Sequence, residues 1–428
     1  MLDARPALLT LALLAACSGG SSSGSSGSTT PPTGSPTAGA TPTASPSGRP
    51  TAPPANQAIT APAGFSVSVV ANVGGARQLA FLPDGDLLVG TLGNAVVLVS
   101  APDAGNAAAG SPVTFATMAE GPAQGVAYGG GYVYVATEHA LWRAPYSAGM
   151  QSANPLQIAS FRQGSIAPNS DGDVHHTSSV AVDGSQLFIG VGSSCNACTE
   201  VDPTRATIQA ANLDGSGMHT YATRIRNPIA LTVNPATGTL WAGGAGQDRL
   251  PTLHPYEYID PVSLHAVGVD YGWPDCEENR VAYASGSDCS NTVIPSLELP
   301  AYATIIGLTF YPANQSGPYA FPASYRGGLF ASVHGSWHTP NGHHVPPGVA
   351  FFPMNGDGPP SPVNWSDPSA QWSEFLSGFQ DDANGDARIG RTTGIAVGPQ
   401  GSLFVADDQS GNIYRIRPSA SGSAQRTR

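Results

Sequence analysis

The chain has 428 residues, of which 52 are Gly and 39 are Pro, and only 11% of its residues are charged. An average globular protein has about 25% charged residues, so this composition excludes coiled coils and long helices with charged outer faces. All 17 cationic residues are arginine, and 29 acidic residues leave a formal net charge of −12. Since phosphate binding needs a basic face, we expect no nucleic-acid partner.

The N-terminus has the pattern of an export signal. An apolar run at residues 7–14 follows Arg5 and is too short to span a bilayer. Small residues then lead directly to Cys17, as in a bacterial lipoprotein signal. We expect residues 1–17 to be this signal and Cys17 to be acylated. The protein would then be anchored to a bacterial membrane through its lipid alone, facing the periplasm or the cell exterior. A plain secretory signal is the alternative.

A low-complexity segment follows the signal. Residues 18–57 consist mainly of Ser, Gly, Thr, Pro and Ala, with almost no large apolar side chain. Such a segment cannot bury enough surface to offset its ordering entropy, so we expect a disordered stalk. Residues 419–428 are expected to form a short disordered tail. The folded domain should therefore span residues 58–418.

Four further cysteines are expected to form two disulfides. Their number is even, and the predicted export places them in an oxidising compartment. The local pairing joins Cys195 to Cys198 and Cys276 to Cys289. A four-cysteine zinc site is the alternative, although the second pair is widely spaced for such a site.

The body of the chain repeats one pattern six times. Each copy is a short apolar run, a turn that contains Gly or Asp-Gly, and a second apolar run, which is typical of an antiparallel hairpin. The copies lie at residues 78–91, 124–138, 178–192, 228–244, 307–334 and 394–408. Six such units predict an all-β fold, namely a six-bladed β-propeller with antiparallel four-stranded blades.

Residues 65–73 form a further apolar segment before the first copy. We expect this segment to complete the last blade and close the ring, because closure protects the edges of the sheets. A pair of β-sandwiches is the alternative architecture. A propeller alone does not indicate a function, since enzymes and scaffolds share it.

Seven stretches of the chain together resemble one protein family. They lie, in the family's order, at residues 191–209, 226–228, 270–274, 307–312, 325–337, 390–391 and 405–416. With them the chain resembles the glucose/sorbosone dehydrogenase family across residues 62–418, and it is most similar to the L-sorbosone dehydrogenase-like branch. The resemblance implies hydride transfer from an aldose or a sorbosone-type sugar aldehyde to pyrroloquinoline quinone, helped by Ca²⁺. An external cytochrome or quinone would then accept the electrons.

The resemblance also implies a site at one end of the central channel, on loops that join the blades. A base must remove the hydroxyl proton of the sugar, and histidine titrates near neutral pH. His175 stands at the family's position for this base, with His176 beside it. Charge develops on the quinone oxygen, and an adjacent arginine stabilises that charge. Arg226 matches this second catalytic position.

Other residues match cofactor-binding positions of the family. Asn227 is expected to bond a cofactor oxygen, and Arg391 is expected to bind a cofactor carboxylate bidentately. Gln124 opens the second repeat and is expected to line the site. His344 falls where the family has a lysine, and it is expected to donate a hydrogen bond to the cofactor.

Calcium in the family is held partly by main-chain carbonyls, and the matching residues are Gly246 and Gln247. The stretches at residues 169–173 and 382–386 alternate Asp or Asn with Gly or small residues. That pattern suits Ca²⁺ and equally suits ordinary turns. A zinc site is a further alternative, formed by His334, His338, His343 and His344.

The chain departs from the family's pattern at several positions. Besides His344, Tyr302 stands where a histidine is expected, and Thr393 stands where the glucose-oxidising branch has a second arginine. These departures leave a second function open, in which a non-catalytic propeller binds a carbohydrate or a protein at the cell surface. A Ca²⁺-dependent hydrolase is a third possibility, although the chain has few of the acidic ligands that it would need.

Overall fold

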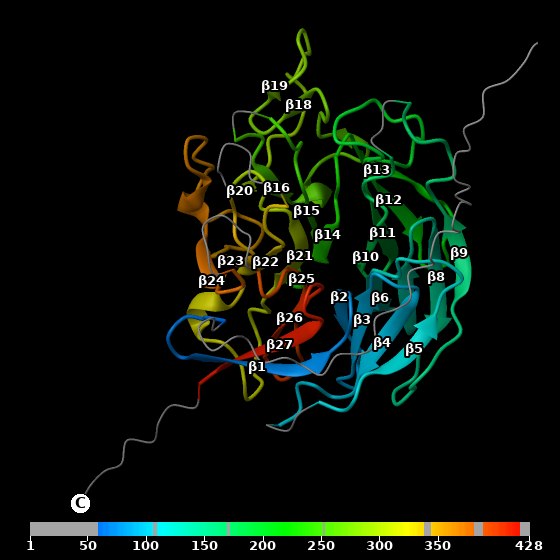
Figure 1. The fold of residues 1–428 in the computed structure, drawn as a ribbon, viewed down its shortest axis with the longest axis vertical. Helices are drawn as coiled ribbons and strands as arrows, with labels where there is room; N and C mark the ends of the chain where they lie inside the picture. Colours follow the sequence, from blue (N-terminus) through cyan, green and yellow to red (C-terminus); the bar gives the residue numbers. More distant parts are fainter. Residues whose placement is uncertain are drawn as a thin grey trace, which may run out of the picture. The chain divides into compact units, whose positions relative to one another are not determined.

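The computed structural model describes residues 59–105, 109–168, 172–250, 253–337, 344–380 and 388–419. These residues form six antiparallel sheets of four neighbouring strands, arranged as the blades of a β-propeller (Figure 1). The predicted all-β propeller is therefore confirmed. Cys17, the predicted stalk and all but the first residue of the predicted tail lie outside the described residues.

Each blade runs in chain order from the channel outward, except that the last blade takes its outer strand from the start of the domain. The first blade comprises β2 (Ala76–Phe81), β3 (Leu87–Thr91), β4 (Ala95–Val99) and β5 (Val113–Thr117). The second comprises β6 (Gly125–Gly129), β7 (Tyr132–Ala136), β8 (Ala140–Pro145) and β9 (Leu156–Ser160). The third comprises β10 (Ser178–Val182), β11 (Gln186–Val191), β12 (Thr207–Asn212) and β13 (His219–Thr223), with β17 (Val269–Asp270) added in parallel to β13.

The remaining blades follow the same plan. The fourth comprises β14 (Ala230–Val233), β15 (Leu240–Gly243), β16 (Glu257–Asp260) and β20 (Leu297–Leu299). The fifth comprises β21 (Ile305–Phe310), β22 (Leu329–Val333), β23 (Gly348–Phe352) and β24 (Ser373–Leu376). The sixth comprises β25 (Thr392–Val397), β26 (Leu403–Asp407), β27 (Asn412–Pro418) and β1 (Phe65–Asn72). The only helices among the described residues are the short 3₁₀ turns η1 (Val262–Leu264), η2 (Ala323–Tyr325) and η4 (Pro368–Gln371), and none is long enough to cross a membrane.

The first and last strands of the domain close the ring. β1 pairs antiparallel with β27, from Phe65 opposite Pro418 to Asn72 opposite Asn412. In Figure 1 the blue β1 therefore lies beside the red β27, although the two are far apart in sequence. The expectation that residues 65–73 complete the last blade is confirmed.

The hydrophobic core is divided among the spaces between the blades. Among the described residues, six of the seven clusters of buried residues each combine side chains from two neighbouring blades, and the seventh is a small group of Cys195, Ala206 and Trp273. Trp241 of the fourth blade, for example, packs edge to face on Phe310 of the fifth, with ring centroids 5.6 Å apart. Because a blade is covered on both faces, a strand such as β3 is buried along its whole length, as sheets covered on both sides are.

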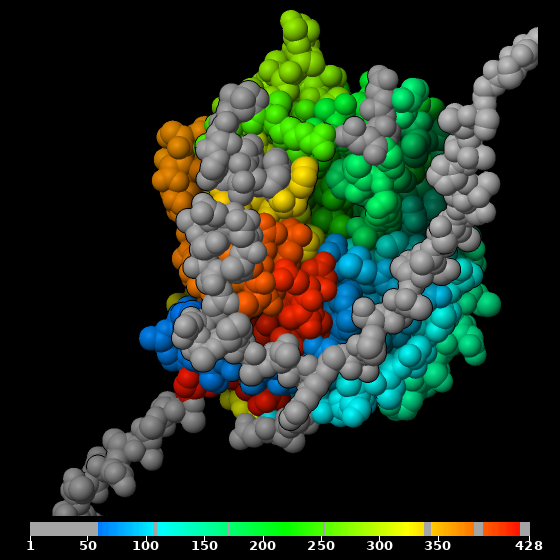
Figure 2. Space-filling view, in the orientation of Figure 1, coloured from blue at the N-terminus to red at the C-terminus, as the bar shows by residue number. Residues whose placement is uncertain are grey.

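Two disulfides join the predicted partners, Cys195 to Cys198 and Cys276 to Cys289. The alternative four-cysteine zinc site is therefore wrong. Cys276 belongs to the small hairpin of β18 (Cys276–Glu277) and β19 (Val281–Ala282), which lies outside the blades. This part of the chain forms the green projection at the upper edge of Figure 2.

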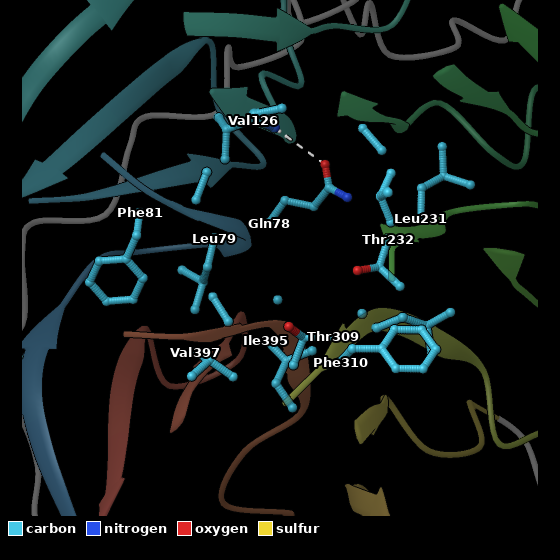
Figure 3. A pocket seen from close by; sticks show the side chains of 18 of the residues that line it. Gln78, Leu79, Phe81, Val126, Leu231, Thr232, Thr309, Phe310, Ile395 and Val397 are labelled. Carbon is cyan, nitrogen blue, oxygen red and sulfur yellow. Dashed lines mark hydrogen bonds between the residues drawn. The ribbon is translucent and has the colours of Figure 1, made fainter. Parts of the chain in front are cut away.

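The channel holds a cavity of about 350 Å³, lined by all six inner strands, which are β2, β6, β10, β14, β21 and β25 (Figure 3). Many of its lining side chains are apolar, as at Leu79, Ile395 and Phe310. Gln78 lies at its edge, and its Oε1 accepts hydrogen bonds from the main-chain nitrogens of Val126 and Val180, at 3.2 and 3.3 Å. One side chain thus ties three inner strands together.

Closure should depend on the anchoring of β1. The Phe65 ring lies 4.6 Å from the ring of Phe321 and 5.3 Å from that of Phe375, between centroids. We expect Phe65→Ala to lower the free energy of unfolding by about 2–4 kcal/mol, somewhat less than a fully buried Phe because Phe65 is partly exposed. Val69→Ala in the same strand is the control, since Val69 is 40% exposed and its loss should cost about 0.5 kcal/mol or less. Equal effects in chemical denaturation would contradict this role for Phe65.

Candidate active site at the mouth of the channel

A second cavity, of about 310 Å³, lies where loops lead into the inner strands and out of the second strands of the blades. We call this end of the channel the mouth. The cavity brings together residues that are far apart in sequence and that come from the third, fourth and fifth blades. Its polar and aromatic lining residues include His175, Asn196, Arg226, Asn227, Asp248 and Trp337. Three of the predicted site residues thus meet at one cavity.

His175 precedes β10 and is half-buried in the wall of this cavity. Its Nδ1 lies 2.9 Å from the main-chain oxygen of Ser193. A carbonyl oxygen can only accept, so Nδ1 carries the proton and Nε2 keeps a lone pair. No described residue forms a hydrogen bond with Nε2. Burial, and then the positive charge of Arg226, lower the pKa of His175 well below its ordinary value. The imidazole is therefore neutral near pH 7.

Arg226 is only 3% exposed, and its guanidinium is held on several sides. Nε donates to the main-chain oxygen of Asn196 at 2.9 Å, and Nη2 donates to Oδ1 of Asn196 at 2.8 Å. Nη2 also lies 2.9 Å from Oδ2 of Asp248, and Nη1 donates to the main-chain oxygen of Ala245 at 3.3 Å. These contacts fix the plane of the guanidinium beside the cavity.

Asn227 follows directly and is 7% exposed. Its Oδ1 is buried without a hydrogen-bond partner among the described residues. Buried polar atoms of this kind are rare in folded proteins. Because Asn227 also lines the cavity, an acceptor without a protein partner among the described residues lies in the cavity's wall.

Glycine at position 192 makes room for this arrangement. A Cβ atom there would lie 2.6 Å from Oδ1 of Asn227 and 2.6 Å from Cβ of His175. Gly244 has a similar role, since a Cβ there would overlap the main-chain oxygen of Asn227. A larger residue at position 192 would displace the side chains of His175 and Asn227, and one at position 244 would displace the main chain of Asn227.

A buried network that the sequence analysis missed joins the first, fifth and sixth blades. Nη1 of Arg77 lies 2.7 Å from Oδ2 of Asp408, and Nε2 of His334 lies 3.0 Å from Oδ1 of the same carboxylate. Burial works against this carboxylate. The His334 hydrogen bond and the Arg77 charge nevertheless lower the pKa of Asp408 below its usual range. Arg77 stands directly before the first repeat, as Asn227 stands directly before the fourth. This shared position in the sequence could have identified Arg77 as a candidate site residue.

Three residues predicted to contact a cofactor do not line the cavity. Gln124 is fully buried, and its Oε1 accepts a hydrogen bond of 2.8 Å from Nε of Arg77. Arg391 donates from Nε and Nη2 to the main-chain oxygens of His334 and Gly335, at 3.0 and 2.7 Å. Burial lowers the pKa of Arg391 to about 10, which still leaves it charged near pH 7.

His344 lies apart from the cavity as well. Its Nε2 is 3.1 Å from Nη2 of Arg388, and its Nδ1 is 3.1 Å from Nε2 of Gln380. The other departures from the family's pattern are also engaged, since Tyr302 donates to the main-chain oxygen of Leu250 and Thr393 to that of Ala76. Of the alternative zinc ligands, His338 and His343 lie outside the described residues.

Gly246 and Gln247 lie in the loop that follows β15, between two residues that line the cavity, Ala245 and Asp248. The Gly246 nitrogen donates to Oε2 of Glu257 at 2.8 Å, and Nε2 of Gln247 donates to Oε1 of Glu277 at 2.6 Å.

The carboxyl groups of Glu257 and Glu277 therefore hold this loop, and burial raises the pKa of both groups to about 8.

Of the two other stretches considered for Ca²⁺, residues 382–386 lie outside the described residues. In the first, Asp173 forms an ion pair with Arg205 at 2.6 Å.

Comparisons with known proteins agree with this architecture. A protein-family model described as TrAA12-like matches residues 273–419. A search of curated protein sequences finds no match to the chain.

Solved structures with the same fold cover most of the chain. The holo form of the PQQ domain of a pyranose dehydrogenase from Coprinopsis cinerea superimposes with a TM-score of 0.67 and 19% identity, covering 85% of this chain and 98% of that one. A calcium structure of a Trichoderma reesei enzyme of carbohydrate-active family AA12 has a TM-score of 0.69 and 18% identity, with the same coverage.

A PQQ-bound aldose sugar dehydrogenase from Streptomyces coelicolor has a TM-score of 0.53 and 17% identity, covering 84% of this chain and 99% of that one. The structural neighbours are thus PQQ-dependent sugar dehydrogenases and AA12 domains, which confirms the resemblance at the level of the fold. Similarity to the sorbosone branch in particular stays a prediction.

The geometry around Gly192 gives a test that needs no ligand. Gly192→Ala should push the His175 ring out of its half-buried position, so the pKa of His175 should rise toward the ordinary value of about 6.5. The titration of the imidazole by NMR measures this shift. Gly74→Ala is the matched control, because a Cβ there would meet no atom within 4 Å. An unchanged His175 pKa in the folded Gly192→Ala protein would contradict the packing argument.

Proposed function

We propose that the chain is a quinone-dependent oxidoreductase that oxidises a sugar with pyrroloquinoline quinone and Ca²⁺ bound at the mouth of the channel. One observation carries this proposal. His175, whose Nδ1 contacts Ser193 and whose Nε2 is left to accept a proton, and the fixed guanidinium of Arg226 line the same cavity of about 310 Å³. A base and a cation beside one cavity are what removal of a hydride from an alcohol requires.

The residues present fit an anionic quinone cofactor. Arg226, Arg249 and Asp248 line the cavity, so the two arginines outnumber the one carboxylate there, in a chain whose net charge is −12. The unpartnered Oδ1 of Asn227 offers a further contact in the same wall. We propose that these residues hold the quinone. Arg391 and His344 do not line the cavity, and we propose that they contribute to cofactor binding from the surrounding loops.

We further propose that the main-chain oxygens of Gly246 and Gln247 contribute to a Ca²⁺ site. The support is the position of their loop, whose two flanking residues line the cavity. The hydrogen bonds to Glu257 and Glu277 fix the loop from its other side. Main-chain carbonyls and carboxylates are the ligands that Ca²⁺ prefers.

The bound quinone supplies the electron-accepting carbon. His175 then has one task, which is to take the hydroxyl proton of the sugar at Nε2. The hydrogen bond from Nδ1 to Ser193 keeps the imidazole in the tautomer that can do so. Arg226 stabilises the negative charge that develops on an oxygen held at its guanidinium, and it needs no rearrangement because Asn196 and Asp248 already fix it.

The finer parts of the proposal concern substrate and place. The substrate class is an aldose or a sorbosone-type sugar aldehyde, oxidised by hydride transfer, and the acceptor is an external cytochrome or quinone. The sequence pattern that ends at Cys17 supports export and lipid anchoring to a bacterial membrane. The alternative function is a non-catalytic propeller that binds a carbohydrate or a protein.

Reconstitution separates the two functions. The purified chain is mixed with the quinone and millimolar Ca²⁺, and the absorbance of the bound cofactor is followed with and without sugars. We expect saturable binding of the quinone and bleaching of its oxidised form by an aldose. A chain that binds sugar but no quinone would instead establish the binding protein.

Substitution of His175 tests its role as the base. We expect His175→Ala to lower kcat by about 10²–10⁴-fold, the usual contribution of a general base, while the affinity for quinone stays within a few fold. His176→Ala is the matched control, because His176 is the exposed neighbour and lies 3.9 Å from Glu138. Similar turnover in both variants would exclude His175 as the base.

The pH dependence follows from the lowered pKa of His175. Only the neutral imidazole accepts a proton, so turnover should be constant through neutral pH. It should fall only when the pH drops below the depressed pKa, which is well under 6.5. Measurement of kcat from pH 4 to 8 checks this, and an acidic limb at or above pH 6.5 would contradict the assignment.

A further inference from the structure

The loop between Cys195 and Cys198 places one asparagine against the catalytic arginine. The main-chain oxygen of Asn196 accepts hydrogen bonds from Nε of Arg226 at 2.9 Å and from Nε1 of Trp273 at 3.1 Å. Its Oδ1 accepts from Nη2 of Arg226 at 2.8 Å and from the main-chain nitrogen of Asp248 at 2.8 Å. Its Nδ2 donates to the main-chain oxygen of Asp248 at 3.0 Å. Every one of these bonds crosses to another segment of the chain.

The disulfide fixes the main chain on both sides of this asparagine. Cys195 and Cys198 are three positions apart, so their bond closes a small ring that contains Asn196. The residues before the ring are held too. Oγ of Ser193 donates to the main-chain oxygen of Cys195 at 2.7 Å, and the nitrogen of Ser194 donates to Glu200 at 2.6 Å. Because Ser193 also binds His175, one constrained loop reaches both catalytic residues.

The chemistry of the contact explains why an amide is used. Asn196 offers two oxygens to Nε and Nη2 on one edge of the guanidinium, in the same paired manner in which a carboxylate binds arginine. An amide carries no charge, so it fixes the orientation of Arg226 without neutralising it. Asp248 also contacts Nη2 of Arg226, at 2.9 Å. Among the described residues it is the only carboxylate within ion-pair distance of Arg226.

We propose that Asn196, held in the Cys195–Cys198 ring, is the positioning residue that orients Arg226 toward the cavity. This inference rests on the proposed function, because it gives Arg226 the task of stabilising charge at the quinone. Asn196 itself acts through Arg226 and also fixes the main chain of Asp248. The disulfide is then part of the catalytic architecture, and its contribution to global stability is secondary.

Three variants test the proposal. Asn196→Ala removes one of the two oxygens that hold Arg226. Asn196→Asp keeps both oxygens, adds a charge and loses the donor to the main-chain oxygen of Asp248. A Cys195→Ser/Cys198→Ser double variant opens the ring. The matched control is Asn234→Ala. Asn234 is also a buried asparagine, at the far end of β14, and its Nδ2 donates to Asp357 at 2.8 Å, away from the mouth.

The measurements are a crystal structure without cofactor, the quinone Kd, kcat at saturating quinone, and Tm. In Asn196→Ala and in the double cysteine variant we expect the guanidinium of Arg226 to leave its position, the quinone Kd to rise about 10-fold or more, and kcat to fall about 10²-fold. In Asn196→Asp the guanidinium should stay in place while the quinone Kd rises, because the added charge offsets that of Arg226. Asn234→Ala should change Tm alone.

The outcomes separate this inference from the proposed function. If Arg226 keeps its position and the quinone Kd is unchanged in Asn196→Ala, the inference is wrong, even if the wild-type protein is an active dehydrogenase. If the wild-type protein binds no quinone, the proposed function fails. The position of Arg226 in the crystal structures of the variants then decides the inference by itself.

Discussion

A blade of this propeller has two apolar faces, and only a closed ring covers both of them. The pairing of β1 with β27 therefore contributes more to stability than its own hydrogen bonds. It completes the sixth blade, which packs against the first and the fifth. Each of the six core clusters is shared by two blades, so no blade holds a complete core of its own. The ring also determines the positions of the loops at the mouth, because these loops lead into inner strands that the ring holds in place.

The mouth also shows how an acidic chain without lysine maintains local positive charge. Arg226 is held by the amide and main-chain oxygens of Asn196, by the main-chain oxygen of Ala245 and by one carboxylate, that of Asp248. Arg391 is held by two main-chain oxygens. Neutral acceptors restrict a guanidinium without cancelling its charge, whereas a carboxylate does both. Most of the hydrogen bonds that orient these two arginines thus come from neutral oxygens, in a molecule whose net charge is −12.

The sequence was sufficient to predict the fold because the propeller repeats one local pattern. Alternating apolar runs around glycine turns predicted the six blades, and the export pattern with an even number of cysteines predicted both disulfides. His175, Arg226 and Asn227, which the family resemblance singles out, line one cavity because all three lie in segments that precede inner strands, and their roles stay predictions.

The missed features depend on contacts that no local pattern encodes. Arg77 and Asp408 are 331 positions apart, and only closure of the ring brings them together. For Gln124 and Arg391, the position before an inner strand was correctly recognised, yet such a position does not determine where a side chain points. Gln124 turns into the wall to support Arg77, and the guanidinium of Arg391 turns toward the main chain of His334 and Gly335.

The bridge formed by Gln78 has a consequence for access to the channel. Its two hydrogen bonds tie β2 to β6 and β10 at the edge of the inner cavity (Figure 3). The inner cavity and the cavity at the mouth share no lining residue, so the described residues form two separate spaces along the channel. Under the proposed function, sugar and electron acceptor would both approach the cofactor from the mouth. Ping-pong kinetics would then follow, with excess sugar competing against the acceptor.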